Sequence, residues 1–127
     1  MNKLFYFCIL FLIFGCSSSD DSKNNSSPLN PPTWIQGKWS MGTGDAQSGF
    51  DFKSDDWCIF GVGLSTCWKS TIESSNGQYK AEEIIGKSSY VTKFSVGGIN
   101  QTYTFLKISD KQIRVTSPTG TLVYDKK

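Results

Sequence analysis

The segment WCIFGVGLSTCW, residues 57–68, is nearly symmetric in residue type about the bond between Val62 and Gly63. A hairpin folded at that bond places Cys58 opposite Cys67 and pairs the two flanking tryptophans. Directly opposed residues in an antiparallel pair have Cα atoms about 4.5–5.5 Å apart, a separation that a disulfide can bridge. The segment therefore predicts a β-hairpin whose two arms are joined by a disulfide.

The tip of this hairpin carries three apolar residues, Phe60, Val62 and Leu64. Apolar side chains at a hairpin tip face water unless another part of the chain covers them, and an exposed apolar patch often marks an interaction site. Two interpretations stay open. Either the tip folds over a barrel end and belongs to the core, or it binds a ligand or a partner.

The chain on both sides of the hairpin alternates apolar and polar residues with period two, and turn residues interrupt it every 8 to 12 positions. The pattern predicts eight or nine strands joined by short turns, and no helix. We expect strands over residues 35–41, 50–52, 57–61, 66–73, 78–85, 88–96, 101–109, 112–117 and 121–126, with a hairpin turn at Asn76-Gly77. The inward residues should include Tyr90, Thr92, Phe94, Val96, Tyr103, Phe105, Ile113, Val115, and Leu122 or Val123.

This succession of strands predicts an all-β fold, a small antiparallel up-and-down barrel of about eight strands. A barrel is favoured because closure leaves no unpaired sheet edge. A two-sheet sandwich of the same strands is the alternative.

The N-terminus has the layout of a secretory signal, with Lys3, then 11 apolar residues at positions 4–14, then small residues from Gly15. The apolar run is shorter than the roughly 20 residues of a spanning helix. Residues 16–32 are rich in Ser, Asp, Asn and Pro, a composition typical of a disordered tether. We therefore expect a signal peptide over residues 1–15, a tether over 16–32 and one domain over 33–127.

The tetrad Ile13-Phe14-Gly15-Cys16 resembles the lipobox of bacterial lipoproteins. The resemblance implies cleavage before Cys16, acylation of that cysteine and attachment to the outer membrane of a bacterial cell envelope. An ordinary signal peptide with a coincidental cysteine is the alternative. Residues 17–21 resemble the surface-export signal of Bacteroidota lipoproteins, although plain tether composition explains them equally well. Outside the cytoplasm, the disulfide between Cys58 and Cys67 should form and persist.

The start of the domain, with Gly37 and Trp39, resembles the Gly-x-Trp signature of lipocalin-type barrels. The end of the chain, at Tyr124, is similar to the close of small lipocalin-like lipoproteins of Bacteroidota. The resemblance implies that Gly37 and Trp39 are structural, at the closed end of a barrel, and that small hydrophobic ligands enter the other end.

Several function classes are disfavoured by composition. The chain has no histidine, which removes the commonest general base and the usual zinc ligand. Its net charge of +2 does not indicate a nucleic-acid partner. Neighbouring Glu82 and Glu83 would face opposite sides of a strand and could not act as a catalytic pair. We expect a protein that is not an enzyme and needs no cofactor.

Three aspartates, Asp51, Asp55 and Asp56, offer the oxygen ligands that calcium prefers, and Asp56 is the best candidate among them. Their spacing matches no known calcium loop, so a solvated turn without a metal is the favoured interpretation.

Together these observations predict a lipid-anchored envelope protein that binds a small hydrophobic ligand at the open end of its barrel. The alternative is a protein-interaction module with a filled barrel, such as an accessory subunit, an inhibitor or an immunity protein. In either case Phe60, Val62 and Leu64 are the candidate binding residues.

Overall fold

A computed structural model of the protein describes residues 29–127, so Cys16 and the predicted signal lie outside the described residues. The described chain contains nine β-strands, one short α-helix and one 3-10 turn. In chain order they are β1 (Gly37–Met41), η2 (Gly44–Ala46), β2 (Ser48–Phe52), β3 (Trp57–Gly61), β4 (Leu64–Cys67), α1 (Trp68–Glu73), β5 (Lys80–Ile85), β6 (Ser89–Val96), β7 (Ile99–Ser109), β8 (Gln112–Ser117) and β9 (Gly120–Lys126).

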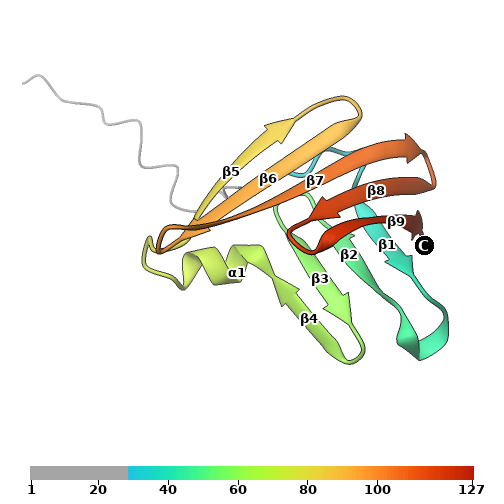
Figure 1. Cartoon of the computed structure of the whole chain (residues 1–127), viewed down its shortest axis with the longest axis horizontal. Helices are drawn as coiled ribbons and strands as arrows, with labels where there is room; N and C mark the ends of the chain where they lie inside the picture. The colour runs from blue at the N-terminus through green and yellow to red at the C-terminus, as the bar shows by residue number, and fades with distance from the viewer. Residues whose placement is uncertain (1–28) are drawn as a thin grey trace, which may run out of the picture.

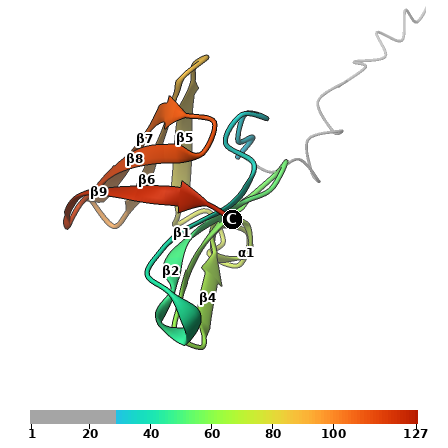
Figure 2. The ribbon, with the colours of Figure 1, turned by 90° about the vertical axis from the view of Figure 1, so that its right-hand side faces the viewer.

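All nine strands belong to one antiparallel sheet in the order β4-β3-β2-β1-β9-β8-β7-β6-β5, which curls into a half-barrel (Figures 1 and 2). The predicted all-β, up-and-down fold is confirmed. The ends of the chain meet, because Trp39 and Ser40 of β1 pair with Lys126 and Asp125 of β9.

We expected the sheet to close into a complete barrel, and this prediction is wrong at one place. Among the described residues, β4 and β5 each pair with a single strand, so they form the two edges of the sheet. The chain passes from one edge to the other through α1 (Figure 1).

Aromatic rings fill the concave side of the sheet. Trp57 lies among the rings of Phe50, Phe94, Tyr103 and Phe105, with centroid separations of 5.1–5.8 Å. Most inward positions predicted for β6 to β8 are confirmed, because the buried core includes Tyr90, Thr92, Phe94, Phe105, Ile113 and Val115. Val96 and Tyr103, also predicted to face inward, are only partly buried. Such ring contacts stabilise a core beyond the area they bury.

One end of the half-barrel is covered by the chain that precedes β1. Leu29 and Ile35 are fully buried there. The Trp39 indole N–H donates to the Ile35 carbonyl oxygen at 2.7 Å, and the Trp34 indole N–H donates to the Gly86 carbonyl oxygen at 3.0 Å. We call this the closed end. The folded unit thus begins by Leu29, before the predicted boundary at residue 33.

The expected strand over residues 66–73 is wrong, because β4 ends at Cys67 and residues 68–73 form the helix α1. The Ser70 and Thr71 hydroxyls donate to the Cys67 carbonyl oxygen, and the Trp68 ring stacks on Phe94 at 3.9 Å. Trp68 therefore lies in α1 and packs into the core, and no strand pairing places it opposite Trp57. Tertiary packing has overridden the strand preference of this segment.

Smaller differences concern turns and strand ends. Asn76 and Gly77 do adopt the positive φ values of a tight turn, 53° and 81°, but the turn joins α1 to β5 and does not connect two strands. β1 begins at Gly37, two residues later than expected. In β9 neither Leu122 nor Val123 is buried. Leu122 faces the concave side opposite Val115, but the deeper inward residue is its neighbour Tyr124.

Candidate functional site

A depression of about 310 Å³ opens on the concave side, at the end of the half-barrel away from the closed end. We call it the mouth. It is bounded by β2 and β3 on one side and by β7, β9 and the β8–β9 turn on the other. Its lining consists of Phe50, Ile59, Gln101, Tyr103, Ser117, Pro118, Thr119 and Tyr124.

The strand registers bring these residues together. Phe50 and Ile59 are directly paired between β2 and β3, so both face the interior. Across the half-barrel the Tyr124 ring of β9 meets the Phe50 ring edge-on, with centroids 5.0 Å apart. The Ser117 hydroxyl contacts the Thr119 hydroxyl and the Gly120 carbonyl oxygen, which fixes the shape of the β8–β9 turn.

The polar groups of the mouth are neutral. Within residues 29–127, the Gln101 side-chain amide and the hydroxyls of Tyr103 and Tyr124 make no hydrogen bond. Burial raises the pKa of both tyrosines, so their hydroxyls stay protonated at neutral pH. The mouth therefore presents ring surfaces together with unused hydrogen-bond donors and acceptors.

The predicted binding residues Phe60, Val62 and Leu64 lie at the tip of the β3–β4 hairpin. The interpretation that the tip is part of the core is wrong, because Val62 is 69% exposed and Leu64 is 76% exposed. Phe60 is half-buried and lies under the Lys38 ammonium, whose Nζ is 4.5 Å from the ring centroid. A second depression of about 320 Å³ lies beside Phe60 and Leu64.

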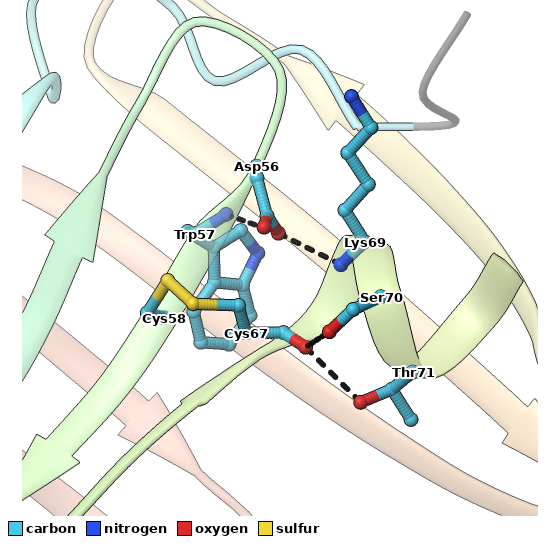
Figure 3. Close-up of a disulfide and its surroundings, with 7 residues drawn as sticks. All are labelled: Asp56, Trp57, Cys58, Cys67, Lys69, Ser70 and Thr71. Carbon is cyan, nitrogen blue, oxygen red and sulfur yellow. Dashed lines mark hydrogen bonds between the residues drawn. A yellow bond between two sulfur atoms is a disulfide. The ribbon is translucent and has the colours of Figure 1, made fainter. Parts of the chain in front are cut away.

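The predicted disulfide is present. Cys58 and Cys67 are paired residues of β3 and β4, and their sulfurs are bonded (Figure 3). Their sulfurs also lie within 4.8 Å of an Asp56 carboxylate oxygen, the one such group of candidate metal ligands among residues 29–127. Since both sulfurs are committed to the disulfide, we assign no metal to this group.

Asp56 has a structural role. Its Oδ1 accepts hydrogen bonds from the backbone N–H groups of Trp57 and Lys69, both at 2.8 Å (Figure 3). Lys69 is the second residue of α1, so Asp56 caps a helix whose own N-cap residue, Cys67, makes no side-chain cap. The carboxylate also complements the positive end of the helix dipole.

The other candidate carboxylates have separate partners. Asp55 accepts a hydrogen bond from the Lys69 ammonium at 2.7 Å, which lowers the Asp55 pKa. Asp51 lies opposite Lys38 in the sheet. Glu83 accepts hydrogen bonds from the Tyr90 hydroxyl and from the backbone and side-chain N–H groups of Asn30, whereas Glu82 is exposed. The structure does not gather these groups into one acidic site.

The two residues of the Gly-x-Trp signature lie at the closed end. Gly37 has a φ of 118°, which lets the chain turn from the preceding loop into β1. Trp39 is fully buried, and the Lys126 ammonium lies 5.3 Å from its ring centroid.

Sequence reasoning did not identify the mouth. Its residues come from five separate segments, and only the pairing of β1 with β9 brings Tyr124 across to Phe50. Tyr103 and Tyr124 were visible as aromatic residues of strands, but alternation alone does not tell a tyrosine at a rim from one in a core.

Among residues 29–127, no helix is long and apolar enough to cross a membrane. Comparison of the chain with protein-family models, curated proteins and solved structures finds no match.

Proposed function

We propose that this protein is a lipid-anchored, non-enzymatic protein of the bacterial cell envelope that binds a small hydrophobic ligand at the mouth. The observation that carries the proposal is the mouth itself, an open depression lined by the rings of Phe50, Tyr103 and Tyr124. Ligand sites are typically concave and mostly apolar, with a few convergent polar groups. A volume of about 310 Å³ suits a small ligand.

The lipid anchor is proposed from the lipobox-like tetrad that ends at Cys16, and the relation to lipocalin-like lipoproteins from Gly37 and Trp39. The chain joins the domain at Leu29, on the closed end. From Cys16 to Leu29 it can reach at most about 45 Å. An anchor at Cys16 would therefore hold the domain within about 45 Å of the membrane surface.

The anchor is tested by mass spectrometry of the protein extracted from its own membrane. We expect an N-terminal fragment that begins at Cys16 and carries two or three acyl chains. A soluble protein with an unmodified N-terminus contradicts the anchor, but it leaves ligand binding at the mouth open.

Ligand binding is tested by native mass spectrometry of the same material, which should show a retained small molecule. Thr119→Trp places a large ring over the mouth from an exposed turn and should abolish retention. Thr116→Trp, on the exposed outer face of β8, is the matched control and should keep the ligand. Equal retention by both variants contradicts binding at the mouth.

A second candidate function is binding of an envelope protein by the hairpin tip. The exposure of Val62 and Leu64, 69% and 76%, favours it, since neither side chain is covered by the described chain. Crosslinking in cells followed by purification should then capture one defined partner. The double variant Val62→Ser/Leu64→Ser should lose that partner, while Leu122→Ser, also apolar and exposed, should keep it.

A further inference from the structure

The polar groups of the mouth restrict the class of ligand further than hydrophobicity does. The Gln101 amide offers both a donor and an acceptor, and each of the Tyr103 and Tyr124 hydroxyls can do either. None of these three groups has a hydrogen-bond partner within residues 29–127. A purely apolar ligand would cover them without replacing their bonds to water, which is unfavourable.

The rings of the mouth favour a flat ligand. Phe50 and Tyr124 meet edge-on, with an interplanar angle of 71°, and Tyr103 of β7 lies on the same side of the mouth as Tyr124. Aromatic rings pack best against other rings, either offset or edge-to-face. Pro118 adds a further flat apolar surface at the rim.

The lining of the mouth is uncharged, which makes the mouth a poor site for ions. None of the described residues that line it carries a charge. An anion or a cation would lose hydration there without gaining a counter-charge.

We propose that the ligand of the mouth is a neutral, flat ring compound with hydroxyl or carbonyl groups at its edge, held by contacts with the partly exposed rings of Tyr103 and Tyr124 and by hydrogen bonds with Gln101 and the two tyrosine hydroxyls. This inference rests on the proposed function, because it names the chemical class of ligand for the same site. It involves no covalent step.

The test compares three probes of similar size: 2-naphthol, which is neutral and can form hydrogen bonds; naphthalene, which is neutral and cannot; and 2-naphthoate, an anion. Each is titrated into the mature protein in detergent and followed by the NMR signal of the Gln101 side-chain amide. A titration of the same detergent without protein corrects for partition into micelles.

We expect 2-naphthol to bind roughly 3- to 10-fold more tightly than naphthalene, the factor that one hydrogen bond supplies. The anion 2-naphthoate should bind more weakly than either. In Tyr103→Phe/Tyr124→Phe the ratio of 2-naphthol to naphthalene affinity should fall toward one, because the rings remain and the hydroxyls are gone. Tyr79→Phe is the matched control, since Tyr79 packs on Trp68 outside the mouth, and it should keep the wild-type ratio.

Equal affinity for 2-naphthol and naphthalene in the wild type overturns the proposal, and so does a preference for 2-naphthoate. Failure of all three probes overturns it as well. In each case the broader proposed function survives if native mass spectrometry still finds a ligand that Thr119→Trp expels.

Discussion

Asp56 connects three parts of the chain with one side chain and its backbone. Its carboxylate binds the N–H groups of Trp57 and Lys69, and its carbonyl oxygen accepts from the Lys53 N–H at 2.8 Å. The turn before β3 and the start of α1 are thereby fixed to each other. A residue that looked like a possible metal ligand in the sequence is a helix cap in the structure.

Asp56→Ala should lower the free energy of unfolding by about 2 kcal/mol, because it leaves the buried Trp57 N–H and the partly buried Lys69 N–H without an acceptor. Urea denaturation measures the change. Asp55→Ala is the control, because Asp55 makes only a partly exposed ion pair with Lys69. The decrease in the free energy of unfolding should therefore be much smaller for this variant and should vanish at high salt. Equal losses in the two variants would contradict the capping role.

Tyr90 links β6 to β5 through its hydroxyl, which donates to a Glu83 carboxylate oxygen at 2.8 Å. Burial and the Glu83 hydrogen bond raise the Tyr90 pKa far above its ordinary value of 10.0. The folded state thus holds this proton more tightly than the unfolded state does. The stabilisation is complete below pH 10 and decreases as the pH rises above that value.

Tyr90→Phe should therefore destabilise the protein at pH 7 by about 1–2 kcal/mol, through loss of the hydrogen bond to Glu83. Above pH 10 the difference in the free energy of unfolding between wild type and variant should shrink by up to about 1.4 kcal/mol per pH unit. The reason is that only the wild type loses the Tyr90 proton on unfolding. Denaturation curves at pH 7, 10 and 11 measure it. A constant difference would show that Tyr90 is not the group responsible.

The β3–β4 hairpin was predictable from sequence because all of its determinants are local. Its near-symmetric sequence contains the turn, the register and both cysteines. The helix α1 was not predictable in the same way, since its cap is 13 residues away at Asp56 and its stacking partner, Phe94, lies on β6. In β7 the pairing with β8 shifts register between Lys107 and Ser109, an irregularity that sequence alternation alone does not locate.

Cys58→Ser/Cys67→Ser should lower the free energy of unfolding by about 2–3 kcal/mol under oxidising conditions, the value for closing a loop of about ten residues. For a domain of this size that lowers the melting temperature by roughly 10 °C or more. Calorimetry with and without a dithiol reductant measures the effect. The reductant should bring the wild type close to the variant and leave the variant unchanged; a wild type that melts at one temperature in both buffers would contradict the prediction.

For the molecule as a whole, the sequence predicted the strand succession and the fold class. It did not predict where the sheet stays open or which residues form the mouth, because both depend on how the two strand groups, β1–β4 and β5–β9, pack across the core. The sequence also placed the start of the domain too late. Leu29 is a buried apolar residue in a segment of polar composition, and composition alone does not show that it is buried.

Leu29→Ala should lower the free energy of unfolding by about 2–5 kcal/mol, the range for a fully buried leucine. Leu64→Ala is the matched control, because the Leu64 side chain is exposed, and it should change stability by less than about 0.5 kcal/mol. Denaturation of the two variants under the same conditions provides the comparison. Similar free energies of unfolding for the two variants would mean that packing of the segment before β1 does not stabilise the closed end.

The pairing of β1 with β9 has a consequence for folding kinetics. The ladders within each strand group join neighbours in sequence, whereas Trp39 and Lys126 are 87 positions apart. Contacts between distant residues require an unfavourable loop closure before they contribute, so they slow folding. The two strand groups can therefore collapse separately, and docking of the first strand on the last should be the late, rate-limiting event. Until it occurs the Phe50 and Tyr124 rings are apart, so the mouth is among the last features of the molecule to form.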